Sequence, residues 1–234
     1  MDPAKGRYKA MKVGKVIERY LKDSEKKWSD IRILETGVGS GETTKWFALQ
    51  GANAYGVDVE DKRLDKDKWS FTLVKNEILP FPDNNFDFVI SKHVIEHVSN
   101  PSLHLQEAIR VLKHNGLGYL STPNRWTIFE PHTKVPFLSM LPLSLRSPYF
   151  RLHNKKEPNE IFDVNPLSRK DCHRLFKDNN ISFNEHTLQT MRDIASIEPM
   201  GWFNKLILKS PKLLFYVALR AIIPTITFLF KKGL

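Results

Sequence analysis

The first candidate for binding chemistry is the segment ILETGVGSGETT, residues 33–44. An apolar run ends there at the carboxylate of Glu35, and Gly37, Gly39 and Gly41 follow. Glycines in this pattern permit a tight turn and let the backbone come close to a ligand. The residues after Gly41 are predicted to begin a helix, whose first N–H groups are free to bind a polar group. The segment therefore predicts a small-molecule binding loop between a strand and a helix.

A second carboxylate, Asp58, ends the next predicted strand in AYGVD. A carboxylate at that position can accept both hydroxyl hydrogens of a ribose. The glycine spacing is G-x-G-x-G, whereas dinucleotide-binding loops have G-x-G-x-x-G. Glu35 would also repel a pyrophosphate but attract an ammonium group. A ligand with an amino-acid end and a ribose end fits better than a nicotinamide or flavin dinucleotide, and S-adenosylmethionine is such a ligand.

A sheet is needed to position these residues, and the chain alternates short apolar runs with segments of helical periodicity. This alternation is typical of an α/β fold with a parallel sheet and helices on both faces. A basic amphipathic helix at 8–22 is expected to lie on the domain surface. Strands are predicted at 31–34, 54–57, 71–74, 86–90, 117–120 and 181–183, and further helices at 43–50, 102–113 and 168–178.

Four segments together resemble class I S-adenosylmethionine-dependent methyltransferases of the small-molecule group. They read ETGVGSG, GVD, LPFPDNNFDFVISKHVIEHV and RVLKHNGLGYLSTPN, and the similarity covers residues 30–124, with a weaker match at 166–185. The resemblance implies a Rossmann-like, seven-stranded, mostly parallel sheet with a reversed last strand. It also implies S-adenosylmethionine as the methyl donor.

The resemblance further implies a set of donor-binding residues. The family's usual adenine-binding aspartate is absent from VKNEILPF, so a substitute is needed there. The implied residues are Glu35, Gly37, Gly39 and Gly41 at the methionine end, Asp58 at the ribose, Asn76 or Glu77 at the adenine, and Ser91 with its backbone facing the methionine group.

Candidates for proton removal lie in SKHVIEHV, where His93, Glu96 and His97 would share one face if the segment were helical. Methyl transfer depends mainly on placement, but an oxygen or nitrogen acceptor also has to lose a proton. His93 or His97 is a candidate general base, and a structural histidine bonded to the backbone is the alternative.

The ubiquinone-type subfamily has E-x-x-E-H here and is thought to bind a divalent metal. Since His93 replaces its first glutamate, we expect no metal. H-x-x-E-H is also a zinc-protease motif, but the strand and glycine context disfavours that interpretation.

An aromatic, proline-rich insert at about 123–166 follows the fifth predicted strand. Ligands of open α/β sheets bind at the carboxyl edge, so the insert is expected to form a lid over the acceptor pocket. An ordinary packing excursion is the alternative. The polar candidates in the lid are Glu130, His132, Arg146 and Arg151.

The C-terminal segment, 196–234, is apolar and basic, with an apolar run at 213–230 that Arg220 and Pro224 interrupt. Lysines flank the run and no acidic residue follows Glu198, which favours a helix lying on an anionic membrane surface through residues 200–234. Packing on the domain or in a dimer, and a membrane-spanning helix, are the alternatives. The central arginine disfavours spanning.

Composition and charge limit the remaining classes of function. The chain has 234 residues, a formal net charge of +10 and one cysteine, which suit an intracellular globular protein. No nucleic-acid-binding motif accompanies the basic charge. We expect a helical cap (1–29), a methyltransferase domain (30–195) and the C-terminal segment. The oligomeric state is not indicated by the sequence.

The predicted function is O-methylation of a small-molecule or lipid-linked glycan acceptor, in the cytoplasm or at the inner face of the membrane. A quinone-like aromatic acceptor is one alternative. A catalytically silent binding module that retains the fold is another.

Overall fold

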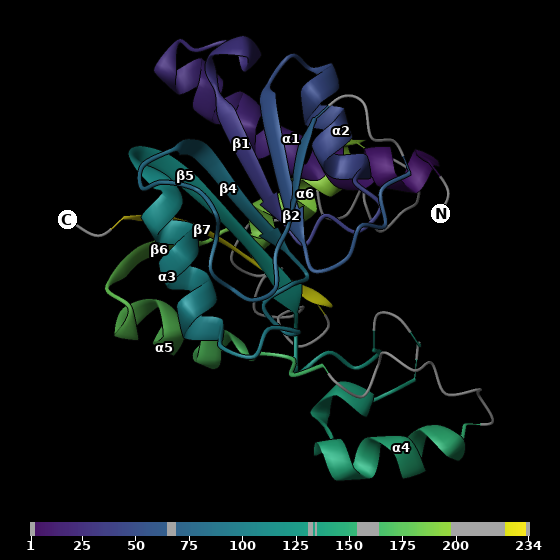
Figure 1. Ribbon diagram of the computed structural model, residues 1–234. Coiled ribbons are helices and arrows are strands. Elements are labelled where there is room, and N and C mark those ends of the chain that lie inside the picture. Colours follow the sequence, from purple (N-terminus) through teal and green to yellow (C-terminus); the bar gives the residue numbers. More distant parts are fainter. Residues whose placement is uncertain are drawn as a thin grey trace.

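The computed structural model describes residues 3–64, 69–130, 133, 135–153, 164–197 and 223–232, and the side chains from residue 10 onward within these ranges. Seven strands form one sheet in the order β3-β2-β1-β4-β5-β7-β6, with helices on both faces (Figure 1). Neighbours from β3 to β5 are parallel, whereas β7 is antiparallel to both β5 and β6. The strands are β1 (Arg32–Thr36), β2 (Asn53–Asp58), β3 (Ser70–Leu73), β4 (Phe86–Lys92), β5 (Leu112–Pro123), β6 (Ile181–Glu185) and β7 (Thr225–Lys232). The expected α/β sheet with a reversed last strand is confirmed.

The helices divide between the two faces. Strand residues alternate between the faces: Ile33 packs in a core cluster with α1 and α2, whereas Leu34 packs in a second cluster with α3 and α5. β4 is apolar along most of its length because helices cover both of its faces, and Phe86–Ser91 are all buried. The helices are α1 (Pro3–Ser24), α2 (Glu42–Leu49), α3 (Pro101–Val111), α4 (Leu143–Arg151), α5 (Arg169–Asp178) and α6 (Thr187–Ile197).

The C-terminal strand corrects one prediction. Residues 225–230 do not belong to a membrane-surface or membrane-spanning helix, because they form most of β7, which lies between β5 and β6. Phe228 and Phe230 are buried in the core, and a Cβ on Gly118 of β5 would lie 2.2 Å from the Phe230 ring. The segment TITFLF is rich in β-branched and aromatic residues, which favour strands. Residues 198–222, which contain the rest of the predicted membrane segment, lie outside the described part of the chain.

The other predicted elements are present with shifted ends. The helix expected to reach residue 113 ends at Val111, and β5 begins at once at Leu112. α4 and α6 were not predicted. Among the helices of the described residues, none combines the length and apolar character that crossing a membrane requires.

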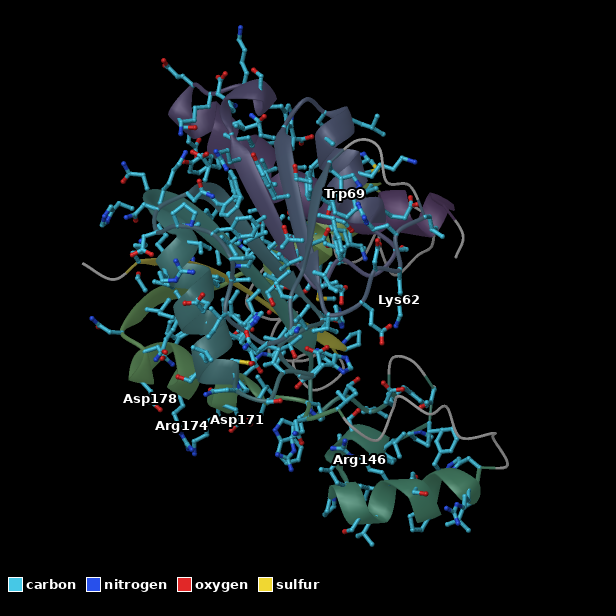
Figure 2. All side chains as sticks on the ribbon, viewed as in Figure 1. Lys62, Trp69, Arg146, Asp171, Arg174 and Asp178 are labelled. Atoms are coloured by element: carbon cyan, nitrogen blue, oxygen red, sulfur yellow. The ribbon has the colours of Figure 1, made fainter. Side chains whose placement is uncertain are left out.

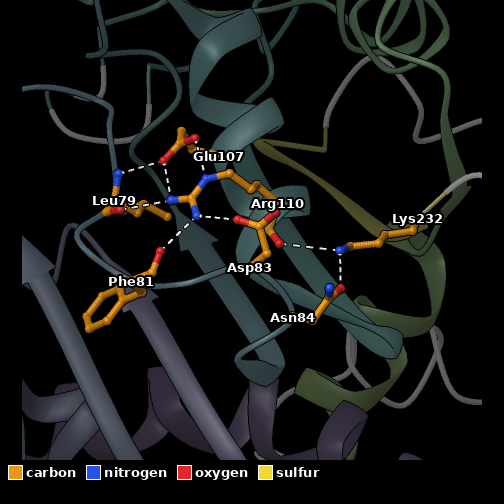
Figure 3. A network of polar contacts seen from close by, with 7 residues as sticks. All are labelled: Leu79, Phe81, Asp83, Asn84, Glu107, Arg110 and Lys232. Carbon is orange, nitrogen blue, oxygen red and sulfur yellow. Dashed lines mark hydrogen bonds and ion pairs between the residues drawn. The ribbon is translucent and has the colours of Figure 1, made fainter.

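A polar network fixes the loop that connects β3 to β4 (Figure 3). Arg110, in the last turn of α3, donates to both carboxylate oxygens of Glu107 at 2.7 and 2.8 Å. It also donates to the Leu79 and Phe81 carbonyls and to Asp83. Glu107 in turn accepts the N–H of Leu79 at 2.8 Å. The planar guanidinium therefore ties one helix end to several points of the loop.

Replacement of Arg110 by alanine is expected to lower the free energy of unfolding by about 2–4 kcal/mol at pH 7, because buried Glu107 loses its cationic partner. The hydrogen bonds from Arg110 hold the pKa of Glu107 below its usual value of 4.5. A depressed carboxyl pKa stabilises the fold above the unfolded-state pKa, and this contribution is lost as the pH falls. The gap between wild type and R110A should therefore narrow below about pH 4.5.

Urea unfolding across this pH range measures both effects. The R110K variant keeps the positive charge but lacks the planar set of guanidinium N–H donors. Its free energy of unfolding should therefore lie between those of wild type and R110A. Equal stabilities of wild type and R110A at pH 7 would show that the network does not stabilise the fold.

Candidate active site

A cavity of about 590 Å³ opens at the carboxyl ends of β1, β2 and β4. Its size suits a cofactor or drug-sized ligand. Lys62, which is labelled in Figure 2, is one of its lining residues. The others include Thr36, Gly37, Gly39, Val57, Asp58, Asn76, Glu77, Leu79, His93, Val94, His97, Ser99 and His104.

The glycine loop forms one wall of the cavity and is bonded to the end of β2. Gly37 donates its N–H to the Val57 carbonyl at 2.8 Å, and Gly39 donates to Oδ2 of Asp58 at 2.8 Å. Gly37 has φ +65°, and a Cβ there would lie 2.3 Å from the Val94 side chain. Only glycine is accommodated without strain at such a position. The loop thus leaves its backbone exposed to the cavity and holds Asp58 at the rim.

The predicted methionine-end residues divide between the cavity and the layer behind it. Gly37 and Gly39 line the cavity, whereas Glu35 is 1% exposed and lies behind it. Glu35 is bonded by Thr44 Oγ1 at 2.5 Å and by the Lys92 ammonium at 3.2 Å. Gly41 begins α2 and faces the Trp69 ring, which would lie 2.4 Å from an added Cβ.

The two adenine candidates have different contacts. Oε1 of Glu77 accepts the N–H groups of Asn100 and Ser99 at the start of α3, which lowers the pKa of this carboxyl. Asn76 is exposed at the cavity rim, and its Oδ1 accepts the N–H of Ile78 at 3.1 Å. Glu77 therefore anchors the loop to α3, and Asn76 presents the freer polar side chain.

Ser91 and His104 form a buried pair at the cavity. Ser91 Oγ lies 2.9 Å from Nε2 of His104, and Ser91 does not line the cavity. Burial lowers the pKa of His104 to about 4, so the ring is neutral near pH 7. Sequence reasoning did not identify His104, although it adjoins the apolar positions of the predicted helix at 102–113.

The segment containing His93, Glu96 and His97 is a turn, so the helical face considered for these residues does not exist. Even so, the turn directs both histidines to the cavity. His93 has φ +56°, an uncommon conformation outside glycine that is often associated with functional sites. Its Nδ1 lies 3.6 Å from Oε1 of buried Glu96, whose Oε2 accepts the Thr122 hydroxyl at 3.0 Å.

A second cavity, of about 30 Å³, lies between the sheet edge and the insert after β5. Its volume is sufficient for one or two water molecules. Glu96 and His97 contribute from the sheet edge, Glu130 and Arg146 from the insert. His97 thus lines both cavities. The apolar lining residues are Pro123, Leu138, Val164 and Pro166.

The candidates in the insert are not all brought together. Arg146 lies on α4, which stands apart from the helices that cover the sheet (Figures 1 and 2). It is buried and donates to the carbonyls of Leu141 and Val164 at 3.0 and 2.8 Å. Burial, with the nearby Arg125, lowers its pKa. Glu130 accepts from Thr133, whereas Arg151 is exposed and donates to Ser147.

His132 lies outside the described residues. Within the ranges that the structure describes, no group of three or more His, Cys, Asp or Glu side chains is arranged to hold a metal ion.

The described cavity fits the donor suggested by the sequence. It combines a rim carboxylate that can accept ribose hydroxyl hydrogens, exposed glycine backbone and the polar Asn76. The volume also admits a whole nucleoside with an amino-acid tail.

Comparisons with known proteins agree with this chemistry. The family described as "Methyltransferase domain" matches residues 34–120. The ubiquinone biosynthesis O-methyltransferase of Pelagibacter ubique is 23% identical over 176 residues, which cover 70% of each chain. A probable S-adenosylmethionine-dependent methyltransferase of Mycobacterium tuberculosis is 31% identical over 109 residues, 44% of this chain and 39% of the relative. The YcgJ protein of Bacillus subtilis is similar in fold, with a TM-score of 0.51, 16% identity and coverage of 87% of this chain and 92% of that one.

The matched segment spans β1 to β5 and therefore contains the glycine loop, Asp58 and both histidines of the cavity. The similarity rests on these residues together with the sheet order. Residues 34–120 contain a methyltransferase domain, and the chain is similar to class I S-adenosylmethionine-dependent methyltransferases.

Proposed function

We propose that this protein transfers a methyl group from S-adenosylmethionine to an oxygen of a small-molecule acceptor, which enters between the sheet edge and the insert after β5. The observation that carries the proposal is the position of His97. This histidine lines both the donor-sized cavity and the smaller cavity beneath the insert. A side chain shared by two adjoining cavities is well placed to contact an acceptor that is presented to the donor.

The residues at the donor cavity would hold the nucleoside along its length. Asp58 would accept the ribose hydroxyl hydrogens, and Asn76 would face the adenine. Glycine backbone at 37–39 lies open beside them. The bound sulfonium supplies an activated methyl group, so the protein contributes mainly by alignment of donor and acceptor.

Proton removal from the acceptor is assigned to His97. A general base needs to lie within hydrogen-bond reach of the acceptor hydroxyl, and His97 faces the space where donor and insert meet. His93 lies deeper against Glu96, at 3.6 Å between Nδ1 and Oε1. Glu96 would orient the ring of His93, which is a supporting role for this pair.

A quinone-like aromatic hydroxyl is the acceptor that the observations favour over a lipid-linked glycan. Pro123, Leu138, Val164 and Pro166 supply an apolar part of the wall of the cavity beneath the insert. A relative that aligns over 70% of both chains is named for O-methylation in ubiquinone biosynthesis.

Replacement of Asp58 by alanine is expected to weaken binding of S-adenosylhomocysteine at least about tenfold, because charge-assisted hydrogen bonds to the ribose are lost. Isothermal titration calorimetry measures the affinity. Because Asp58 also holds Gly39, an analogue without the ribose hydroxyls is titrated in parallel.

Wild type should bind this analogue more weakly than S-adenosylhomocysteine, whereas D58A should bind the two ligands with similar affinity. E60Q changes a neighbouring exposed carboxylate and should behave as wild type. Retained discrimination by D58A would remove Asp58 from the ribose site.

Replacement of His97 by alanine is expected to lower kcat for methyl transfer about 100-fold or more, as loss of a general base does, with donor affinity retained. The assay supplies labelled S-adenosylmethionine with a prenylated dihydroxybenzene or with a lipid-linked oligosaccharide. H114A, at an exposed histidine, is the control. Methyl transfer to the oligosaccharide alone would overturn the aromatic acceptor. A loss of kcat in H93A but not in H97A would assign the general base to His93.

We also propose that the basic, apolar residues 200–222 contact an anionic membrane surface at the cytoplasmic face. They include Lys205, Lys209, Lys212 and Arg220 without an acidic residue, and each basic side chain near such a surface contributes about 1 kcal/mol. Full-length protein should therefore float with anionic liposomes, whereas a variant with the three lysines changed to glutamine should not. Equal flotation of both proteins would exclude this segment as the anchor, and substitution avoids the loss of β7 that truncation would cause.

A further inference from the structure

We propose that Lys92 is a specificity-determining residue for the methyl donor. Its ammonium group would bind the α-carboxylate of the methionine end, while its partner Glu35 binds the α-ammonium group. The inference rests on the proposed function only for the identity of the donor and is independent of the acceptor.

Neither member of this charged pair lines the donor cavity, but each is followed in the sequence by residues that do. Lys92 Nζ lies 3.2 Å from Oε1 of Glu35 and 2.5 Å from Oγ1 of Thr43 at the start of α2. Thr36 and Gly37, which follow Glu35, line the cavity, and so does His93, which follows Lys92. β1 and β4 are paired in parallel register, with Thr36 opposite Ser91. The pair therefore lies where both strands reach the cavity.

The burial of the pair explains why a cation is needed at this position. The Glu35 side chain is 2% exposed, whereas that of Lys92 is 19% exposed. A buried carboxylate is strongly destabilising without a compensating charge. Lys92 supplies that charge in the absence of ligand and remains partly accessible. Its ammonium has three N–H donors, and the contacts with Glu35 and Thr43 use two of them, which leaves one for a further acceptor.

A carboxylate and an ammonium side by side are complementary to an amino-acid zwitterion. The methionine end of the donor carries both charges at neutral pH. Binding of this end would replace one internal ion pair by a four-charge arrangement in which each group faces an opposite charge. Lys62 also lines the cavity but is exposed and paired with Glu60 next to Asp58, toward the ribose. Lys92 is therefore better placed for the carboxylate.

Three ligands separate this role from a purely structural one. S-adenosylhomocysteine carries both charges, its decarboxylated analogue carries only the ammonium group, and 5′-methylthioadenosine carries neither. Calorimetry with wild type should show the first ligand bound about tenfold or more tightly than the second, as expected for a charge-assisted contact. In K92M this preference should disappear, while the affinity for 5′-methylthioadenosine should remain that of wild type.

Companion variants protect the test against misfolding. The double variant K92M/E35Q removes the uncompensated buried carboxylate and should also lack the preference for the carboxylate-bearing ligand. K92R should retain part of the preference, and K22M, at an exposed lysine near the end of α1, should keep all of it. Circular dichroism and thermal unfolding verify that each variant is folded.

The outcomes are distinguishable. An unchanged preference in folded K92M or in the double variant would overturn the proposal, and so would an equal loss of affinity for all three ligands. Absence of S-adenosylhomocysteine and S-adenosylmethionine binding by the wild type would instead contradict the donor assignment itself.

Discussion

The hydrogen-bonded pairing of β1 with β2 on one side and with β4 on the other brings the carboxyl ends of three strands to one edge of the sheet. Everything at the donor cavity follows from this alignment. The glycine loop leaves β1, Asp58 ends β2 and the histidine turn leaves β4. Because the strands are buried on both faces, their register cannot slip by one residue without reversal of the two cores. The packing that stabilises the sheet therefore also fixes the positions of the polar groups at its edge.

Both burial and ion pairing determine which side chains at this edge of the sheet carry a charge. Glu35 and Lys92 neutralise each other where water is scarce, whereas burial keeps His104 uncharged beside Ser91. The charged pair thus lies next to residues of the glycine end of the cavity, whereas His104 places a neutral imidazole on another wall. A ligand with separated charges and an uncharged base meets a matching distribution of polarity. In the role proposed for Lys92, the amino-acid end of the donor would contact residues on two strands as well as the glycine loop.

Local sequence signals were sufficient to predict that several polar groups and glycines gather at one cavity, because these residues lie in short segments that follow strands. The glycines and Asp58 have this character, and the structure brings Asp58, Gly37 and Gly39 together. Features that depend on partners distant in sequence were not predicted. The place of β7 depends on Gly118 more than a hundred residues earlier. The ion pair of Lys92 depends on Glu35, and the turn at His93 depends on a backbone hydrogen bond to Ser121. The spacing of apolar residues within one segment carries no information about partners that are distant in the sequence.

The two halves of the site also differ in how they are built, and this difference bears on specificity. The donor half lies on buried strands and on a loop tied to β2 by backbone hydrogen bonds, so its geometry is set by the core. The proposed acceptor half comes from the insert after β5, where buried Arg146 donates to the carbonyls of Leu141 and Val164. An insert at the sheet edge can change in shape without disturbance of the strand register. We infer that the donor site is the part that this chain has in common with the methyltransferases it resembles. We also infer that the insert facing His97 determines which acceptor is bound.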